Sequence, residues 1–252
     1  MQLRFHFHGD LTFFLTAESS QQPVTRSLHE KTSVKDAIEA CGVPHTEVDL
    51  ILCDGSPVGF SHHLTDDAEI DVYSTFGSPQ QFAARRLQER GITKFVADGH
   101  LGKLARHLRL LGFDVAYDAI ADDPALLEIS GREKRALLTR DRRLLMHAVV
   151  RDGYCPRSDD PEEQTVEVIR RFDLEALLAP FSRCLVCNAA FERVDKKDVL
   201  DRLEPLTKIY YQDFRRCVVC GKIYWAGSHF GKLQSRIRQI REAVGSQRKR
   251  GN

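Results

Sequence analysis

Residues 94–117 read KFVADGHLGKLARHLRLLGFDVAY and set the architecture of the middle of the chain. The stretch begins with a short apolar run, continues with apolar residues at helical spacing up to Gly112, and ends with a second apolar run. A strand, a helix and a strand in this order predict a parallel βαβ unit. The runs at 137–139 and at either 149–150 or 154–155 extend the unit to a parallel α/β sheet.

Aspartates stand beside these pieces. Asp98 follows the first apolar run, Asp141 follows the run at 136–140, and Asp123 precedes Pro124 at the start of a further helical pattern. In parallel sheets the carboxyl ends of the strands gather along one edge, where ligands bind. Carboxylates that meet there repel one another unless a cation lies between them. The sequence therefore predicts a divalent-metal site suited to phosphodiester chemistry.

Each aspartate taken singly also fits a simpler role as a helix cap or turn residue, and Asp123 before Pro124 fits an N-cap well. Asp122 is an alternative to Asp123, while Asp159 and Asp160 stand before another predicted helix and are candidates for a fourth ligand. The case for a metal site rests on the three aspartates taken together.

Four of the seven cysteines form two Cys-x-x-Cys pairs, Cys184 with Cys187 and Cys217 with Cys220. Each pair predicts a tight turn that offers two thiolates, and two such turns complete a tetrahedral zinc site with no open position for catalysis. The site is therefore expected to be structural. The 29-residue insert between the pairs contains a predicted strand at 208–211. The other three cysteines lie in apolar runs and are expected to be core thiols: Cys41, Cys53 and Cys155.

Basic and aromatic side chains surround the second cysteine pair: Arg215, Arg216, Lys222, Tyr224 and Trp225. They offer charge and stacking surface for nucleic acid, although packing against the metal turn is an equal alternative for the two aromatic residues. The tail after Gly231 adds a basic stretch with a partial apolar stripe at helical spacing.

The first 76 residues predict a small α+β unit. An alternating strand at 3–7 turns at Gly9 into a second predicted strand at 11–15, and Ser33 is placed to N-cap a helix. Later strands are expected at 48–52 and 70–73, with a hairpin turn at Asp54-Gly55 after the first of them.

This pattern resembles a ubiquitin-like fold of the sulfur-carrier type. Such carriers end in an exposed Gly-Gly, whereas here Gly77 is followed by Ser78-Pro79 and the chain continues. Activation as a carrier or conjugated tag is therefore not expected, and a docking or structural role is the better hypothesis.

Charge is distributed unevenly over the 252 residues. Residues 1–80 hold four basic and twelve acidic residues, whereas the remainder holds 33 basic and 24 acidic ones. The excess of basic residues after residue 80 favours a polyanion as the partner of that part of the chain. The simpler alternative is that the charges lie on solvated surfaces and are unevenly distributed by chance. No apolar run of about 18 residues predicts a membrane helix, and the N-terminus lacks the apolar stretch of a signal peptide. A soluble cytoplasmic protein is expected.

Several motifs together resemble the Mut-7 C-terminal RNase family, a branch of the PIN-like nucleases. The run 95–114, FVADGHLGKLARHLRLLGFD, resembles its opening motif, and the run 138–144, LTRDRRL, resembles its second signature. The runs 183–188 and 217–229 around the two cysteine pairs resemble its zinc-ribbon signatures. One departure is His107, where the family usually has tryptophan and which is expected on the helix surface.

The resemblance runs from about residue 93 to 233, and residues 1–76 resemble the ubiquitin-like domain often fused ahead of it. It implies an α/β and α+β multidomain chain. The expected parts are a ubiquitin-like β-grasp (1–76), a linker and lead-in (77–92), a PIN-like parallel-sheet nuclease domain (93–180), a zinc ribbon (181–231) and a basic C-terminal helix or tail (232–252).

The family implies a divalent-metal ribonuclease, expected to be endonucleolytic. By resemblance Asp98 and Asp141 are core ligands of Mg²⁺ or Mn²⁺ and Asp123 is a third. Basic residues near them are candidates for holding phosphates or stabilising the transition state, with solvated surface charge as the alternative for each: Lys103, Arg106, Arg140 and Arg142. The alternative functions are a non-catalytic RNA-binding zinc-ribbon protein, and a protein-interaction scaffold led by the acidic head with a protein partner.

Overall fold

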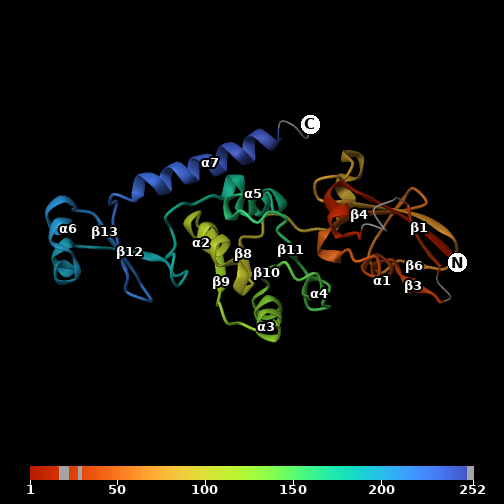
Figure 1. Ribbon diagram of the computed structural model, residues 1–252, viewed down its shortest axis with the longest axis horizontal. Helices are drawn as coiled ribbons and strands as arrows, with labels where there is room; N and C mark the ends of the chain where they lie inside the picture. Colours follow the sequence, from red (N-terminus) through yellow and green to blue (C-terminus); the bar gives the residue numbers. More distant parts are fainter. Residues whose placement is uncertain (17–22, 28–29, 249–252) are drawn as a thin grey trace.

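The computed structural model describes residues 1–16, 23–27 and 30–248, and its parts follow one another along an elongated molecule (Figure 1). A β-rich N-terminal part lies at one end, a parallel sheet with helices lies in the middle, and the cysteine-rich part lies at the other end. Helix α7 (Phe230–Arg248) leaves the cysteine-rich part and runs back over the middle of the molecule. Residues 249–252 of the predicted basic tail lie outside the described residues.

The N-terminal part is a mixed five-stranded sheet in the order β2-β1-β7-β4-β5, with β1 and β7 parallel and the other neighbours antiparallel. Helix α1 (Val34–Glu39) completes it. This is the predicted ubiquitin-like β-grasp. The strands of both its sheets are β1 (Gln2–His8), β2 (Val24–Ser27), β4 (Val48–Cys53), β5 (Ser56–Val58) and β7 (Ala68–Ser74), with β3 (Thr32–Ser33) and β6 (His63–Leu64) as a separate pair.

Two local predictions in this part are confirmed and one is wrong. The Ser33 hydroxyl accepts from the Asp36 backbone N–H at 3.1 Å and caps α1, and Asp54-Gly55 turns with positive φ at both residues, as a type I′ hairpin needs. The strand predicted at 11–15 is instead the 3-10 helix η1 (Gly9–Phe14). Gly9 has a φ of +70°, and a 3-10 helix buries Leu11 and Phe14 together because residues three apart share a face.

The central part is a four-stranded, fully parallel sheet in the order β11-β10-β8-β9. The predicted α/β unit is therefore confirmed, and the fourth strand begins one residue before the second of the two predicted segments. The strands are β8 (Lys94–Ala97), β9 (Asp114–Tyr117), β10 (Ala136–Leu138) and β11 (Gly153–Tyr154). The helices are α2 (Gly102–Leu110), α3 (Asp123–Glu133), α4 (Arg142–Leu145) and α5 (Pro161–Arg171).

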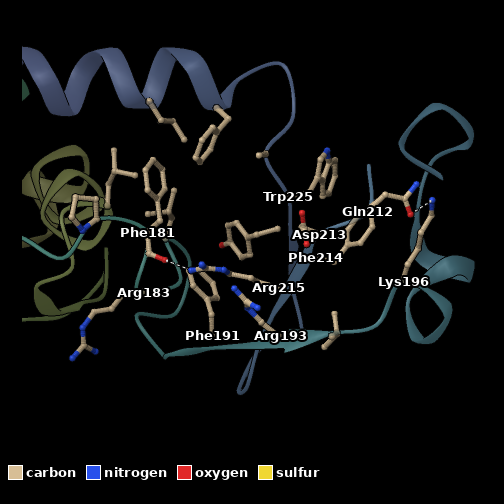
Figure 2. Close-up of a pocket in the computed structure, with 18 of the residues that line it drawn as sticks. Phe181, Arg183, Phe191, Arg193, Lys196, Gln212, Asp213, Phe214, Arg215 and Trp225 are labelled. Carbon is tan, nitrogen blue, oxygen red and sulfur yellow. Dashed lines mark hydrogen bonds between the residues drawn. The ribbon is translucent and has the colours of Figure 1, made fainter. Parts of the chain in front are cut away.

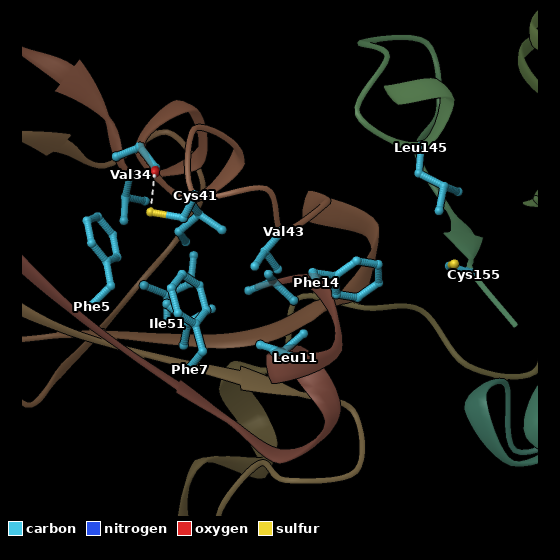
Figure 3. Packing of buried hydrophobic residues seen from close by; sticks show 14 of the residues in the cluster. Phe5, Phe7, Leu11, Phe14, Val34, Cys41, Val43, Ile51, Leu145 and Cys155 are labelled. Carbon is cyan, nitrogen blue, oxygen red and sulfur yellow. Dashed lines mark hydrogen bonds between the residues drawn. The ribbon is translucent and has the colours of Figure 1, made fainter. Parts of the chain in front are cut away.

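The two faces of the central sheet bury different cores. Phe95 and Ala97 point to one face, where they pack with α2, α5 and three apolar residues of α7: Ile237, Ile240 and Val244. Val96 points to the other face and joins a cluster that continues through Leu145 and Cys155 into the N-terminal core (Figure 3). The N-terminal part and the central sheet therefore share one apolar cluster.

The cysteine-rich part is a three-stranded antiparallel sheet of β12 (Phe191–Val194), β13 (Phe214–Cys217) and β14 (Ile223–Tyr224). The strand predicted at 208–211 is wrong, because the segment belongs to helix α6 (Pro205–Tyr210), which Pro205 opens. Its buried apolar core contains only Val199, Leu203 and Phe214 among the described residues. The remaining 3-10 helices are η2 (His45–Glu47), η3 (Gln80–Arg85), η4 (Gly99–Leu101), η5 (Glu175–Leu177), η6 (Lys196–Asp198) and η7 (Leu200–Arg202).

None of the helices in the described part of the chain combines the length and the apolar character that crossing a bilayer would require.

Candidate active site and metal centre

Asp98 and Asp141 lie at the carboxyl ends of neighbouring strands. Ala97 pairs with Leu138 in the β8–β10 register, so the next residues, Asp98 and Thr139, stand side by side. The Thr139 hydroxyl donates to Asp98 Oδ2 at 2.7 Å and accepts from the Asp141 backbone N–H at 3.0 Å. Thr139 is fully buried. One buried hydroxyl therefore links the two aspartates and fixes how their segments approach each other.

Both aspartates also act as helix caps. Asp98 Oδ1 accepts from the His100 N–H at 3.4 Å, and Asp141 Oδ1 accepts from the backbone N–H groups of Arg143 and Leu144 at 2.7 and 3.3 Å. The second oxygen of Asp141 receives no donor within the described residues. Because each carboxylate has two oxygens with several lone pairs, capping with one leaves the other for a cation.

Asp123 occupies a different place from the one expected. The N-cap of α3 is Asp122, whose Oδ1 accepts from the Ala125 N–H at 3.0 Å, and Asp123 is the exposed first residue of the helix. The prediction that Asp123 is the N-cap of this helix is therefore wrong by one residue. Among the described residues, no three carboxylates gather their ligand atoms within 4.8 Å of one another. Asp98, Asp123 and Asp141 thus do not form a preformed group of three ligands in the described part of the chain.

The other candidate carboxylates have their own partners. Asp160 N-caps α5 through the N–H groups of Glu162 and Glu163, and the exposed Asp159 forms an ion pair with Arg140. Sequence reasoning missed Asp118, which directly follows β9 as Asp98 follows β8, since Ala97 pairs with Tyr117. The signal for it was available: the residue after each parallel strand lies at the same edge.

The basic residues near this edge divide into two groups. Lys103 and Arg106 are exposed on α2, have no partner within the described residues, and line a pocket of about 420 Å³ beside Asp160. Arg142 instead donates to the carbonyl oxygens of Phe14 and Phe13 at 2.7 and 3.2 Å. Arg142 therefore holds α4 against the N-terminal part, and Arg140 is held by Asp159.

His107 does not lie on the helix surface as expected. It is half-buried where α2 meets α5, with Nδ1 3.3 Å from the Pro161 carbonyl oxygen, and burial lowers its pKa.

The four paired cysteines form the second candidate site. Their sulfur atoms all lie within 4.8 Å of one another, with 3.7 Å between Cys184 and Cys220 and 3.2 Å between Cys187 and Cys217. A tetrahedral zinc ion with Zn–S bonds of about 2.3 Å would place its sulfur ligands about 3.8 Å apart. The donor type, number and spacing therefore fit a closed Cys₄ site.

Matching backbone turns present the sulfur atoms. The Asn188 N–H donates to the Cys184 carbonyl at 2.9 Å and the Gly221 N–H donates to the Cys217 carbonyl at 3.0 Å. Both donors have a left-handed backbone, with φ of +70° and +68°. Burial opposes ionisation of Cys184, but hydrogen bonds from the Cys187 N–H and the Tyr224 hydroxyl lower its pKa to about 6. These hydrogen bonds therefore favour the thiolate form of Cys184, which is the form that binds a metal.

Two models of known protein families match the chain. A family model for the Mut7-C RNAse domain matches residues 93–237, and a model for the Mut7-C ubiquitin domain matches residues 1–80. The chain belongs to the Mut7-C RNase domain family. No curated protein and no solved structure matches the chain. The Mut7-C match covers the parallel sheet, the four cysteines and the first part of α7.

The first cysteine turn of the Mut7-C domain is docked directly onto the parallel sheet. Buried Arg109 donates to the Val115 carbonyl in β9 at 2.8 Å and to the Val186 carbonyl in the turn at 2.8 Å. Asn188 accepts from the Val115 N–H at 3.1 Å and donates to the Asp114 carboxylate at 2.7 Å. The cysteine turn thus continues the hydrogen bonding of edge strand β9.

The Mut7-C ubiquitin-like domain is docked through buried charges. Glu47 is 2% exposed and accepts two hydrogen bonds from the Arg157 guanidinium, at 3.0 and 2.8 Å, and one from the Cys155 N–H at 2.7 Å. Arg157 also pairs with Asp10 at 3.0 Å, and despite burial the neighbouring acids raise its pKa. Acidic residues of the N-terminal part thus pair with a basic residue of the central part within the same chain.

Proposed function

We propose that this chain is a divalent-metal-dependent endoribonuclease whose active site lies at the carboxyl edge of the central sheet. Asp98 and Asp141 are its core ligands, and Asp123 is the third. The observation that carries the proposal is that the buried Thr139 hydroxyl binds both the Asp98 carboxylate and the Asp141 backbone N–H, since it joins two acidic residues 43 positions apart at neighbouring strand ends. The family match to an RNase domain supports RNA as the substrate.

The residues at this edge fit a hard cation. Carboxylate oxygens are the ligands that Mg²⁺ and Mn²⁺ prefer, and an incompletely ligated protein site leaves positions for water and phosphate. When bound, such a cation would supply an activated water and would stabilise charge on the phosphate. Asp98 and Asp141 would hold it, and Asp123 would join through movement of the α3 N-terminus or through water.

The other residues at the edge orient the substrate. Thr139 fixes the direction of Asp98 by its hydrogen bond, and such outer partners determine how well a ligand presents its oxygen. Lys103 and Arg106 carry uncompensated positive charge on α2, which begins just after Asp98. They would bind the phosphates that flank the scissile bond and stabilise the developing negative charge there.

We also propose that the four cysteines hold a structural Zn²⁺. Four thiolates complete its coordination, and the buried apolar core around it contains few residues, so metal binding would supply the folding free energy of the ribbon. The face of the ribbon that carries Arg193 and Arg215, with the neighbouring aromatic rings, would then assist RNA binding.

The test distinguishes a metal-binding role of Asp98 and Asp141 from their role as helix caps. Asparagine caps helices about as well as aspartate, so Asp98→Asn and Asp141→Asn keep the caps and remove the charge that a cation needs. Asp160→Asn is the matched control, because Asp160 caps α5 in the same way. We expect Mn²⁺-dependent cleavage of mixed RNA to fall by 10²-fold or more in the first two variants and to stay unchanged in the control. Equal cleavage by all three variants would show that the assignment is wrong.

The alternative is a non-catalytic RNA-binding protein, and one observation favours it: Asp98 and Asp141 each already cap a helix or 3-10 helix. This alternative predicts salt-sensitive RNA binding without turnover in any divalent metal. A cleavage assay with Mn²⁺ and with chelator on the unmodified chain distinguishes the two functions.

For the ubiquitin-like domain we propose a structural role. Its buried Glu47 and its η1 segment already bind the central part through Arg157 and Arg142. A protein partner would therefore have to bind another of its faces.

A further inference from the structure

The three-stranded sheet β12-β13-β14, called here the ribbon sheet, carries an oppositely charged pair on one face and a like-charged pair on the other. On β12 and β13, Glu192 is paired with Arg216, and their side chains form an ordinary ion pair at 2.7 Å. The next pair along the strands is Arg193 with Arg215, two arginines directly opposite each other. Like charges in this position destabilise a sheet. The sheet therefore carries a repulsive pair on one face, where an anion would relieve it.

Within the described residues, neither arginine of this pair forms an ion pair. Exposed Arg193 has no partner among the described residues, and Arg215 donates to the neutral carbonyl oxygen of Phe181 at 3.1 Å. Lys196 nearby donates to the Gln212 side-chain amide at 3.1 Å, which is also neutral. Two acidic residues, Asp195 and Asp213, line the same pocket, and the first of these already pairs with Lys197.

Aromatic rings lie among these cations. Figure 2 shows Phe191 beside Arg193 and Arg215, with Trp225 further along the same pocket below α7. Tyr224 is the β14 partner of Arg215 and contacts Phe191 at 4.8 Å between ring centroids. The pocket measures about 710 Å³. Aromatic faces interleaved with free cations are the arrangement that binds unpaired bases and their phosphates.

This ribbon pocket adjoins the pocket that Lys103 and Arg106 line. Three apolar residues line both of them: Leu110, Leu185 and Leu233. The second pocket contains Lys103 and Arg106 without partners, and it reaches Asp160 next to Asp159. Arg236 lines it too but is paired with Glu162. Together the pockets make a groove that runs from the ribbon to Lys103 and Arg106 on α2.

We propose that this groove binds a single-stranded RNA segment, whose bases stack in the ribbon pocket and whose backbone continues past Lys103 and Arg106 to the carboxylates. The proposal rests on the proposed nuclease function and specifies its substrate as RNA with an unpaired flank. A duplex would not fit, because its bases are already stacked and cannot reach the rings.

The test uses the full-length, zinc-loaded chain carrying Asp98→Asn, so that RNA is bound but not consumed. Fluorescence anisotropy measures its affinity for labelled oligouridylates of about 12 and about 4 nucleotides and for a 12-base-pair RNA duplex. Arg193→Ala is the main variant, since Arg193 is exposed and unpartnered. Arg216→Ala is its matched control, because it removes the same charge from the opposite face of the adjacent strand.

We expect Arg193→Ala to weaken binding of the longer strand about tenfold. The slope of the logarithm of the binding constant against the logarithm of the salt concentration should become less steep by about 0.7, the value for one lost phosphate contact on a single strand. Arg216→Ala is expected to change the affinity less than twofold. Trp225→Ala is expected to cost about 5-fold to 150-fold through lost stacking, with zinc content measured to verify that the ribbon remains folded. Lys103→Ala should weaken the longer strand but not the shorter one, which fills the ribbon pocket alone.

Equal effects of Arg193→Ala and Arg216→Ala would exclude the groove as the RNA-binding site, and so would a duplex that binds as tightly as the single strand. Displacement of the RNA by polyglutamate at comparable concentration would also exclude it, because it would indicate an acidic protein partner. Failure of the two proposals looks different. Cleavage that is insensitive to Arg193→Ala would remove the groove and keep the nuclease. Binding as predicted, without cleavage by the unmodified chain in Mn²⁺, would remove the nuclease and keep the groove.

Discussion

The cysteine cluster and the carboxylate edge are two candidate metal sites built in opposite ways. The four sulfur atoms converge within 4.8 Å on two matching turns, whereas the Thr139 hydroxyl links Asp98 to the Asp141 backbone and, among the described residues, no three carboxylates converge in this way. The first arrangement is closed and suits a permanent ion. The second is open, and each of its paired aspartates also caps a helix. A site that must admit RNA has to leave coordination positions free, and a site that only holds the fold does not.

The largest expected effect concerns the closed site. Cys217→Ser removes one thiolate, and a structural zinc in such a module contributes on the order of 10 kcal/mol to folding. We expect loss of bound zinc and unfolding of the ribbon, measured by metal analysis and by amide exchange over residues 181–229. Cys53→Ser is the control, since Cys53 is half-exposed in the N-terminal part. Retained zinc in Cys217→Ser would contradict a four-thiolate site.

The next effect tests how the ubiquitin-like domain is docked onto the central part that carries the open site. Glu47→Gln leaves the buried Arg157 guanidinium without its strongest partner, and breaking a buried pair costs about 3–5 kcal/mol. We expect the free energy of unfolding to fall by this amount in denaturant titration, while zinc content stays unchanged. Glu69→Gln is the control, because its partners Arg4 and His6 lie at the surface. Equal losses in both variants would show that the Glu47–Arg157 pair is not special.

A smaller effect tests the bridge inside the open site. Thr139→Val keeps the shape of the side chain but removes the hydroxyl that joins Asp98 to the Asp141 backbone. Loss of such an outer partner typically costs 10-fold to 100-fold in metal affinity or activity. We expect the Mn²⁺ concentration for half-maximal cleavage to rise by this factor, with Thr139→Ser restoring it. An unchanged Mn²⁺ requirement would show that the bridge does not orient Asp98.

The smallest effect concerns the junction of the two regions. Arg135 and Asn188 hold the pKa of Asp114 below its usual range, even though its burial acts in the opposite direction. A depressed carboxyl pKa contributes stability above the unfolded value of about 3.9, and this stability is lost as the pH falls through the folded pKa. We expect Asp114→Asn to lower stability at pH 7 by about 2 kcal/mol and to reduce the loss on acidification below pH 4. The same acid sensitivity in parent and variant would contradict this.

Much of this comparison was predictable from the sequence. The parallel sheet followed from the apolar runs, and the adjacency of Asp98 and Asp141 followed from the rule that strand ends share an edge. The Cys-x-x-Cys spacing predicted the convergence of the sulfur atoms. In each case the chemistry is carried by residues close to an element whose type the local pattern specifies.

The remainder depends on contacts that no local pattern contains. The cap of α3 falls on Asp122 rather than Asp123 because the preceding loop sets where the helix begins. Asn188 takes the turn role that glycine plays at Gly221, and its side chain is held by β9, which lies 73 residues earlier in the sequence. The Glu47–Arg157 pair joins residues 110 positions apart. The position of the α3 cap, the docking of the cysteine turn onto β9 and the long-range Glu47–Arg157 pair were therefore not predictable from local sequence.

The most direct test of the account is Mn²⁺ binding to the unmodified chain and to Asp98→Asn, Asp141→Asn and Asp160→Asn, measured by electron paramagnetic resonance after zinc loading. If Asp98 and Asp141 share one cation, the same Mn²⁺ site disappears in either of the first two variants and persists in the third. Mn²⁺ binding that survives both Asp98→Asn and Asp141→Asn would contradict a shared site and with it the proposed active centre.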